Sequence, residues 1–480
     1  VALARRSGLC IMGPNCNGLI NFVDAFAMTT TATIAGPRKA AGNVAVVSQS
    51  GGAGQVNIMW RAQEAGLGIS YQVSCGNSAD LNVIDFIDFM LDDAATDVVM
   101  TLVEHIPDGR RFLETARRAA ELKKPIVMVK LGRTEAGGHA AASHTGAMAG
   151  SDAVTDAALR QCGVIRVDDT NELYEMAMLL RAKRIPRGPR AAATTISGGN
   201  GVLLVDHGAA QGLVWPQYSD ATRESLKALL PKMATTGNPT DVSNALVGKG
   251  ELFQRCVETI AADANVDCVI PTYTMAPRAD LDAAVAAWRA TAAPMAMLWV
   301  GGCNDQREFS ARDVAATGMP VYRNTLTCVK AVAAAARYGA FLAARRAPPT
   351  RPAGIDVEAA RALLAGASGT LTERASKQVL AAYGLPVTRE ALATSAAEAV
   401  RIAGQFGGAV AMKIESADIP HKTEAGAIRL GVKGPAAVRE AYKAVMDAAK
   451  SYKPQARLEG VLVQEMAPAG LEMMLGLVTD

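Results

Sequence analysis

The sequence predicts an α/β protein that is divided into several domains, and three observations support this prediction. The 480 residues are too many for a single hydrophobic core. Strand-like apolar runs alternate with amphipathic helical stretches, which is typical of parallel sheets covered by helices. Two of the runs end in Ser-Gly-Gly and lead into a helix, at residues 50–52 and 197–199. We therefore expect two doubly wound domains, followed by a region of different character.

The first doubly wound domain is expected to begin with a strand in residues 43–52 that enters a glycine turn. Further strands are predicted in residues 97–106 and 124–132, because both runs are apolar and of strand length. The stretch 110–124 between them has the apolar spacing of a helix.

A second series of strands is predicted in residues 190–201, 266–274 and 293–302. It resembles the first series, since both open on Ser-Gly-Gly and both later carry Gly-Asn-x-x-Asp, at residues 76–80 and 237–241. The second series spaces its two motifs more widely. The recurrence favours two related domains.

Residues 343–354 are basic and contain three prolines, which predicts an interdomain linker. After it come helical stretches at 373–384 and 395–407, and then a strand at 409–415 with a polar loop. This pattern indicates a separate α+β nucleotide-binding module.

The composition excludes several classes of protein. Half of the residues are hydrophobic, 20% are charged and the formal net charge is +3, so a soluble globular protein is expected. No long basic run alternates with aromatic residues, which argues against a nucleic-acid partner. The apolar stretches are of strand length or are interrupted by charge, as at Arg337, so no membrane span is predicted. The eight cysteines are scattered and are expected to be buried and reduced, which indicates the cytoplasm.

Among the five histidines, His144 is the candidate for chemistry. It lies among very small residues ahead of a helix start expected at Ser151 or Asp152, so its imidazole would be accessible and the backbone could approach an anion. The alternative is a loop histidine that makes one hydrogen bond. His139 is expected to be solvated, and His105 and His207 to be structural.

Each Ser-Gly-Gly turn would direct backbone N–H groups at a helix start towards a phosphate. Two such turns from related domains could hold one phosphate from opposite sides. Glu104 ends a predicted strand, where active residues of doubly wound domains gather, and its carboxylate could fix the tautomer of an imidazole. A tight turn and a surface glutamate are the alternatives.

In the last module, Lys413 lies on a predicted strand and suits a nucleotide phosphate, although an edge lysine is equally common. The polar loop 415–431 that follows contains His421, Lys422 and Glu424. It is expected to be mobile, and a polar hairpin is the alternative.

These residues resemble a known family. The segments SQSGG, SCGNSAD, LVEHIPDGRRF, SHTGAMAGSD, ISGGNGVLLVD, GNPTD and IPHKTEAGAIRLG occur in this order. The chain is similar over essentially its whole length to the NDP-forming acyl-CoA synthetases. These are relatives of succinyl-CoA synthetase that include acetate–CoA ligases and some feruloyl-CoA synthetases.

The resemblance implies two flavodoxin-like, succinyl-CoA synthetase-like domains and a partial ATP-grasp domain, preceded by the tail of a Rossmann CoA-binding domain. The implied boundaries are 1–36 for the Rossmann remnant, 41–183 and 188–342 for the flavodoxin-like domains, 343–354 for the linker and 355–480 for the ATP-grasp part. Because both ends fall inside expected elements, we expect a fragment without full activity. The acidic ligands of Mg²⁺ would lie beyond Asp480, so no metal ligand is expected within the chain.

The resemblance also implies a role for each matching residue. His144 matches the phosphorylated histidine, Glu104 the carboxylate that steadies it, and His421 a second histidine on a swinging loop. The phosphate-binding helix starts match Ser50, Gly51, Gly52, Ser197, Gly198, Gly199 and Asn200. The loop near CoA and the acyl group matches Gly13, Pro14 and Asn15. The ATP-phosphate lysine matches Lys413, and the adenine hinge matches Gln464, Glu465 and Met466. Ala427 departs from the family, which often has a glycine there.

The implied activity is that of an acid–CoA ligase. A carboxylic acid, CoA and ATP would give acyl-CoA, ADP and phosphate through a phosphohistidine and an acyl phosphate, with Mg²⁺ as cofactor. Two alternatives stay open: the core of a protein lysine acetyltransferase, against which the presence of His144 argues, and a non-catalytic nucleotide- or acyl-CoA-binding subunit. The acid is not specified by the sequence, and a homo-oligomer is expected.

Overall fold

The computed structural model describes residues 2–31, 41–145, 151–302, 309–344, 352–367, 369–471, 473 and 476, apart from the side chains of Arg5, Ala245 and residues 141–145. The chain divides into two units, one formed by residues up to Arg345 and one by Arg346–Thr479. Each unit has its own sheets and its own core.

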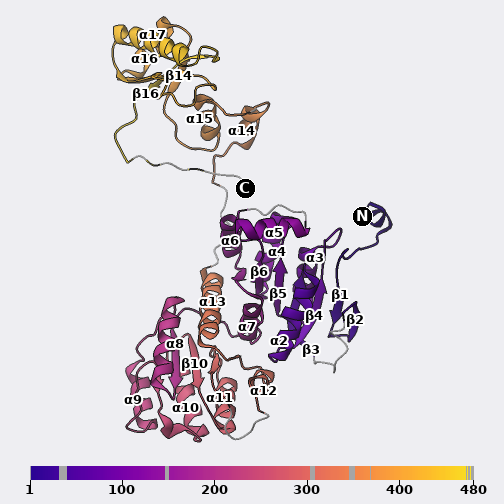
Figure 1. Ribbon diagram of the computed structural model, residues 1–480. Helices are drawn as coiled ribbons and strands as arrows, with labels where there is room; N and C mark the ends of the chain where they lie inside the picture. Colours follow the sequence, from indigo (N-terminus) through magenta and orange to yellow (C-terminus); the bar gives the residue numbers. More distant parts are fainter. Residues whose placement is uncertain are drawn as a thin grey trace. The chain divides into compact units, whose positions relative to one another are not determined.

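The first unit contains a seven-stranded sheet in the order β2-β1-β4-β3-β5-β6-β7 (Figure 1). Its strands are β1 (Gly18–Asn21), β2 (Phe26–Thr29), β3 (Ala41–Ser48), β4 (Ile69–Ser74), β5 (Val98–Val103), β6 (Ile126–Lys130) and β7 (Ile165–Val167). The five strands from β3 to β7 are parallel, whereas β1 runs antiparallel to both β4 and β2. Numbered along the chain, the parallel strands have the order 2-1-3-4-5, which is the flavodoxin-like arrangement.

Helices cover both faces of this sheet. The helices are α1 (Ala2–Ser7), the π-helix η2 (Ala53–Trp60), α2 (Arg61–Glu64), α3 (Val83–Asp92), α4 (Gly109–Glu121), α5 (Glu135–Thr145), α6 (Asp152–Gln161) and α7 (Thr170–Leu180). Val47 and Val99 point into the core formed with α3 and α4, whereas Val46 and Met100 point into the core formed with η2 and α7. Alternate residues of each strand are therefore buried on opposite faces.

The second sheet of this unit has the order β12-β11-β10-β8-β9, and all its strands are parallel. Its strands are β8 (Ala191–Thr195), β9 (Thr240–Asp241), β10 (Cys268–Tyr273), β11 (Met297–Trp299) and β12 (Val321–Tyr322). Its helices are α8 (Gly198–Ala210), α9 (Asp220–Leu229), the 3₁₀ helix η3 (Asn244–Leu246), α10 (Gly250–Ala261), α11 (Arg278–Ala290), α12 (Ala311–Ala316) and α13 (Thr325–Ala344). Counted along the chain, the order is again 2-1-3-4-5, so the predicted fold class of two doubly wound domains is confirmed.

The strand registers show that one of the two expected motif correspondences is wrong. Ser48 pairs with Ser74 in the first sheet, and Thr195 pairs with Asp241 in the second. The Gly-Asn-x-x-Asp of residues 76–80 therefore follows its strand, whereas that of residues 237–241 runs into its strand. The motifs therefore do not occupy equivalent positions. The wider spacing in the second domain comes from the additional helix α9 between α8 and β9.

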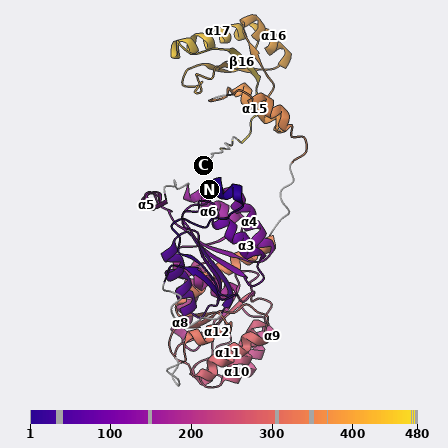
Figure 2. The same cartoon turned by 90° about the vertical axis from the view of Figure 1, so that its right-hand side faces the viewer.

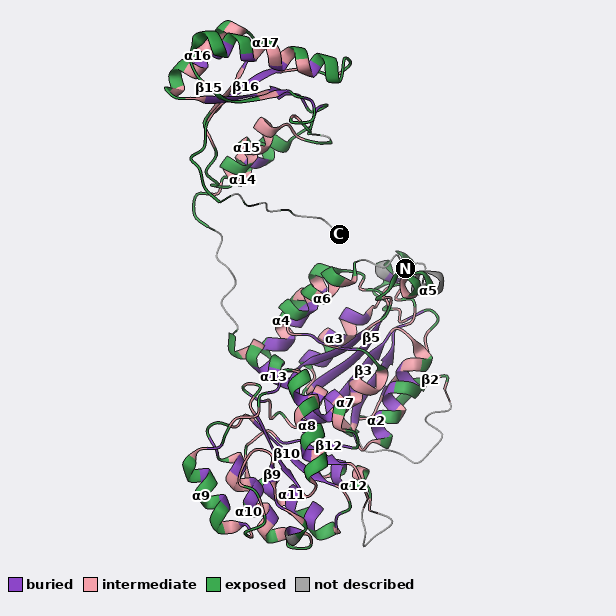
Figure 3. Ribbon diagram, turned by 60° about the vertical axis from the view of Figure 1, so that its left-hand side comes forward, coloured by how far each residue is buried: buried purple, intermediate pink, exposed green. Residues whose placement is uncertain are grey.

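The two domains of the first unit share one continuous hydrophobic core. Buried residues of both sheets, together with α7 and α13, belong to the same cluster. Figure 3 shows the buried residues along the strands of both sheets and the exposed residues on the outer sides of α9 and α10. Helix α13 is long and apolar enough to cross a membrane by length and composition, but half of its most apolar window is buried against the rest of this unit.

The segment predicted to be a Rossmann remnant contributes β1 and β2 to the first sheet. No sheet boundary therefore separates residues 18–29 from the first flavodoxin-like domain.

The second unit contains an antiparallel sheet in the order β13-β16-β14-β15. Its strands are β13 (Glu390–Ala393), β14 (Val410–Glu415), β15 (Ile428–Val432) and β16 (Gly460–Glu465), and its helices are α14 (Val357–Leu364), α15 (Glu373–Ala382), α16 (Ala396–Phe406) and α17 (Pro435–Tyr452). Within this unit, α16 and α17 lie on one side of the sheet and α15 on the other (Figure 2). Ile402, Val438 and Val445 form the core with β14 and β16.

We expect Gly339→Ala to destabilise the first unit by about 1–3 kcal/mol, because overpacking forces the backbone apart. A Cβ at Gly339 of α13 would lie 1.9 Å from the carbonyl oxygen of Pro186. The measurement is the midpoint of thermal unfolding. Gly109→Ala is the matched control, since no described heavy atom lies within 4 Å of the added Cβ, and it should leave the midpoint unchanged or raise it. An unchanged midpoint for Gly339→Ala would contradict this close packing.

Candidate active site

The first candidate site lies at the carboxyl ends of β3 and β5, where the strand order of the first sheet reverses. In open α/β sheets, ligands bind in the crevice at this point. Gln49 follows β3, and its side-chain oxygen accepts hydrogen bonds from the backbone N–H groups of Glu104, at 2.6 Å, and His105, at 2.9 Å. Its side-chain nitrogen donates to the carbonyl oxygen of His105 at 2.7 Å. Gln49 therefore fixes the backbone that carries Glu104 beside the first Ser-Gly-Gly turn.

Lys130, the last residue of β6, supports the same loop. Its ammonium group donates to the carbonyl oxygens of Glu104, at 2.7 Å, and Leu131, at 2.6 Å. Burial lowers the pKa of Lys130, and the neighbouring Arg166 lowers this pKa further. The Glu104 side chain itself is partly exposed.

The Ser50–Gly52 turn is fixed by Ser48, the last residue of the strand that precedes it. The hydroxyl of Ser48 donates to the carbonyl oxygen of Ser50 at 2.7 Å. A Cβ at Gly54 would lie 2.6 Å from Ser48 Cβ, so glycine allows the first helical turn to approach the strand. The N–H groups at this helix start are available to an anion.

The predicted CoA and acyl loop lies beside this turn. The backbone N–H of Asn77 donates to the carbonyl oxygen of Pro14 at 2.9 Å, and Asn15 donates from its side chain to that of Asn77 at 3.3 Å. A Cβ at Gly51 would lie 2.6 Å from Asn17 Cγ, so Asn17 packs directly on the Ser50–Gly52 turn. The structure thus brings together residues 13–15, residues 50–52 and Glu104.

The second turn, Ser197–Asn200, has the same local construction. The hydroxyl of Thr195 donates to the carbonyl oxygen of Ser197 at 2.8 Å, as Ser48 does in the first domain. However, a Cβ at Gly198 would lie 3.6 Å from a carboxylate oxygen of Asp241, where the first domain has Ser74 by strand register. Asp241 therefore places a carboxylate beside this helix start that the first domain lacks, so the two turns differ chemically. No hydrogen bond joins them within the part of the chain that the structure describes, and their shared hold on one phosphate stays a prediction.

Residue His144 lies in the last turn of α5, so the described backbone is helical where a loop was expected. Its side chain and residues 146–150 lie outside the described residues. Helix α5 follows β6, which places it at the same edge of the sheet as Glu104. The helix start expected nearby is confirmed, because Ser151 is the N-cap of α6.

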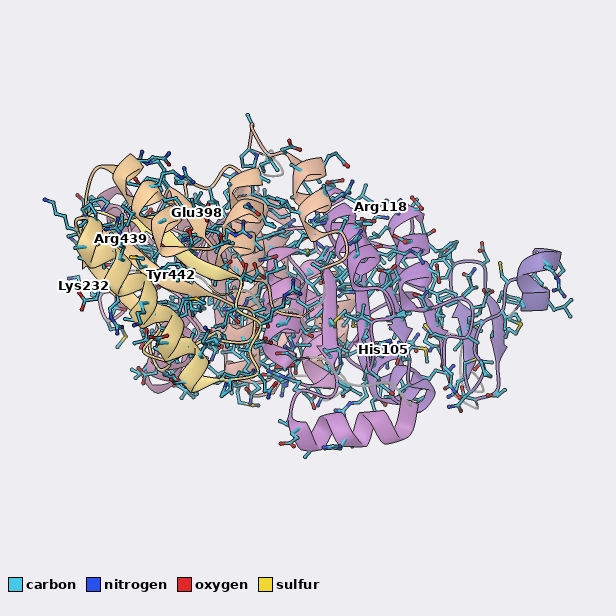
Figure 4. All side chains as sticks on the ribbon, turned by 90° about the horizontal axis from the view of Figure 1, so that it is seen from above. His105, Arg118, Lys232, Glu398, Arg439 and Tyr442 are labelled. Atoms are coloured by element: carbon cyan, nitrogen blue, oxygen red, sulfur yellow. The ribbon has the colours of Figure 1, made fainter. Side chains whose placement is uncertain are left out.

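His105 was expected to be structural, but the structure corrects this. The His105 side chain is exposed directly after β5. Figure 4 labels it, and it lies well away from Arg118 of α4. His139 is exposed on α5, as expected. His207 is partly buried on α8.

In the second unit, three lysines surround Glu373, the first residue of α15. Lys413 of β14 donates to Glu373 Oε1 at 2.8 Å, Lys377 of α15 donates to the same oxygen at 2.9 Å, and Lys422 donates to Oε2 at 3.2 Å. Burial alone would raise the pKa of Glu373, but the hydrogen bonds from Lys413 and Lys377 more than offset it. The pKa is lowered from 4.5 to about 2. A cluster of this kind is suited to a polyphosphate.

The predicted adenine hinge follows on β16. Gln464 accepts a hydrogen bond from Lys377 at 3.2 Å, so it belongs to the lysine cluster. Glu465 accepts from the backbone N–H of Arg389, at 2.8 Å, and from its guanidinium, at 2.7 Å, which ties β16 to the start of β13. Met466 is exposed just after the strand.

The loop between β14 and β15 forms a helical turn. The N–H of Ala425 donates to the carbonyl oxygen of His421 at 3.1 Å, and Gly426 has a φ of 62°, which ends the turn. His421 is exposed and makes no hydrogen bond through its side chain to a described residue. Ala427 is fully buried in the core of this unit, so its methyl group packs against the other residues of that core.

A further cavity of about 810 Å³ lies between the two domains of the first unit. It is lined on one side by Tyr174 and Glu175 of α7, and on the other by Phe309, Tyr322 and Arg323. Burial raises the pKa of Glu175 to about 7, and the nearby carboxylates of Glu172 and Asp169 contribute.

Sequence reasoning missed Gln49, Lys130, Glu373 and Lys377. Gln49 directly precedes the Ser-Gly-Gly turn, and Lys130 ends a strand as Glu104 does, so their positions at strand ends were the available signal. No sequence signal relates Glu373 to Lys413, which lies 40 residues away. Among the described residues, no group of three or more His, Cys, Asp or Glu side chains could hold a metal ion.

Comparison with known proteins adds independent findings. The model of a succinyl-CoA ligase like flavodoxin domain matches residues 41–180, and an ATP-grasp domain model matches residues 362–480. The ADP-forming acetate–CoA ligase I of Archaeoglobus fulgidus is 32% identical over 100% of this chain and 68% of its own length. The ADP-forming 4-hydroxybutyrate–CoA ligase of Nitrosopumilus maritimus is 29% identical over 99% of this chain and 68% of its own length.

Among solved structures, the dinucleotide forming acetyl-coenzyme A synthetase 1 of Ca. Korarchaeum cryptofilum, in complex with phosphate and ADP, is similar with a TM-score of 0.64. It is 28% identical, and the match covers 72% of this chain and 75% of that chain.

We expect Glu175→Gln to stabilise the first unit at high pH. Because the folded pKa of Glu175 is raised from 4.5 to about 7, stability is lost as pH rises from about 4.5 through 7. The glutamine variant lacks this loss, so its thermal midpoint should exceed that of the wild type by about 2–4 °C at pH 8 and should match it at pH 5. Glu114→Gln, which changes an exposed carboxylate of α4, is the control. If the difference in thermal midpoint between Glu175→Gln and the wild type is the same at pH 5 and pH 8, ionisation of Glu175 is not its cause.

Proposed function

The chain belongs to the family of ADP-forming acid–CoA ligases, and from this membership we propose how its residues carry out the reaction. The enzyme converts a carboxylate, CoA and ATP into acyl-CoA, ADP and phosphate, and the reaction is reversible. The β–γ phosphoanhydride bond of ATP is broken, and a thioester is formed. The phosphoryl group has to travel between the site of ATP cleavage and the site of thioester formation.

The carboxyl edge of the first sheet is the observation on which the proposal depends. It carries Glu104, the Ser50–Gly52 turn, the loop of residues 13–15 and the start of the segment that contains His144. We propose that the imidazole of His144 accepts the phosphoryl group. A carboxylate at Glu104 would hold one ring nitrogen as a donor and leave the other nucleophilic.

The N–H groups of the Ser50–Gly52 turn would stabilise the phosphoryl oxygens without reorganisation. The phosphoryl group then passes to the substrate carboxylate, which gives an acyl phosphate, and the CoA thiolate displaces phosphate from it. Residues 13–15 would position CoA or the acyl group, because their loop is bound to Asn77 and Asn17, which follows them, packs on this turn. Ser197–Asn200 is proposed as a second phosphate-holding helix start.

In the second unit, Lys413 is proposed to bind ATP phosphate, and Gln464, Glu465 and Met466 to form the adenine hinge. His421 is exposed, which supports a role in receiving phosphate from the nucleotide. The cofactors of the reaction are ATP or ADP, CoA and Mg²⁺. The described residues offer no metal cluster, and we assign no step to Mg²⁺.

We propose domain boundaries at 1–36, 41–183, 188–342, 343–354 and 355–480. The boundary near residue 345 is supported by the division into two units. The partners are CoA, nucleotide and a carboxylic acid, and we propose a homo-oligomer. We propose a cytoplasmic location, because the seven described cysteines are free thiols.

Incubation of the full-length protein with ATP labelled at the γ-phosphate should give an acid-labile, alkali-stable label. His144→Ala should remove the label from the peptide that contains residue 144, because the phosphoramidate of the carrier forms on its imidazole, whereas label on His421 can remain. His139→Ala is the matched control, since it removes an exposed imidazole from the same helix, and it should keep full labelling. Label that remains on this peptide in His144→Ala would argue against the proposed phosphate carrier.

Gln49→Leu should slow labelling by about 10–100-fold, because it releases the backbone that positions Glu104 and small misplacements are costly in catalysis. The measurement is the initial rate of labelling at saturating ATP, beside the thermal midpoint. Gln161→Leu makes the same change at an exposed position of α6 and should leave the rate unaltered. Equal rates in the two variants would show that Gln49 does not position Glu104.

A further inference from the structure

Two lysines of the second unit share a single carboxylate. Lys413 lies on β14, and Lys422 lies in the loop that leads from β14 to β15. Their ammonium groups donate to opposite oxygens of Glu373, at 2.8 Å and 3.2 Å. Both side chains are largely buried, with 17% and 15% of their surface exposed. The carboxylate thus holds two cations side by side, and a small part of each remains exposed.

The third lysine of the cluster is bound differently. Lys377 reaches Glu373, Thr388, Glu390 and Gln464, at 2.9, 3.4, 2.7 and 3.2 Å. An ammonium group has three N–H donors, so four acceptors saturate Lys377. Its function is to anchor Glu373 to the sheet, and it has no donor left for a ligand.

The ammonium groups of Lys413 and Lys422 each have N–H donors that bind no described residue. Each makes one hydrogen bond, to Glu373, and neither donates to any other described residue. Four of their six N–H donors are therefore available. Such a pair is best satisfied by an anion with several oxygens on adjacent centres, because charge-assisted hydrogen bonds to phosphate are strong and a polyphosphate can engage both lysines.

We propose that Lys422 is a second polyphosphate-binding residue beside Lys413, and that Glu373 is a positioning residue that holds both ammonium groups at the spacing the phosphates require. This inference rests on the proposed function and adds to it a site for the β- and γ-phosphates of ATP. Lys422 directly follows His421, so the phosphates would be bound next to the exposed imidazole.

The test measures equilibrium binding to the full-length protein. The probes are the non-hydrolysable analogue adenylyl imidodiphosphate, AMP and CoA. Lys422→Gln should weaken binding of the analogue at least tenfold, because one charged contact to phosphate is lost, and should leave AMP and CoA binding unchanged. Lys433→Gln is the matched control, since it removes an exposed charge at the end of β15 and should change none of the three affinities. Retained AMP binding shows that the unit is folded.

Glu373→Gln tests the positioning role. It should weaken binding of the analogue several-fold. In the double variant with Lys422→Gln, the total loss should be smaller than the product of the two single losses, because part of the loss caused by Glu373→Gln is the misplacement of Lys422 itself. Effects that multiply in the double variant would refute the positioning role.

The outcomes also separate this inference from the proposed function. If the wild type binds the analogue and Lys422→Gln binds it equally well, the second lysine is refuted and the ligase assignment stands. A loss of CoA affinity with unchanged affinity for the analogue would likewise refute it, since the phosphates of CoA would then be the ligand. If the wild type binds no adenine nucleotide, the proposed ATP site fails and the inference fails with it.

Discussion

The side-chain amide of Gln49 is the interaction on which the site in the first unit depends. The strand order reverses between β3 and β5, and this reversal opens a crevice whose two walls belong to different strands. Backbone pairing stops at the strand ends, so another group has to fix the relative position of the two loops. Gln49 supplies it through hydrogen bonds to both N–H groups and one carbonyl group of the opposite loop. Lys130, at the end of β6, supports that loop.

The two units differ in the charged groups that they gather at their candidate sites. In the proposed mechanism, the first unit offers a helix start and a single carboxylate to a phosphoryl group that is attached to the protein only briefly. The second unit gathers three ammonium groups and neutralises them in part with Glu373 and Glu390. Like charges held so close would repel each other without these carboxylates. The difference fits a site that has to release its phosphate and another that has to hold a nucleotide.

The sequence was sufficient to predict the doubly wound domains, because their strands are apolar and their glycine turns are conspicuous. It also predicted the start of α6 at Ser151 or Asp152, and Ser151 is the N-cap of this helix. The equivalence of the two Gly-Asn-x-x-Asp motifs was wrong, because spacing along a chain does not reveal strand register. Residue 144 was expected in a loop, whereas tiny residues are also compatible with a helix, and alanine favours one. Contacts such as Lys413 with Glu373 join residues far apart in sequence, and only the packing of α15 against the sheet creates them.

The continuous core of the first unit has a consequence for how such a protein can be divided between genes. A chain break between α7 and β8 would cut one apolar interior in two, and each product would expose the surface along α7 or α13 that the other had covered. A break near Arg345 separates regions that each enclose their own interior. Fission of the gene at the second position would yield two polypeptides able to fold alone, whereas fission at the first would yield two that aggregate.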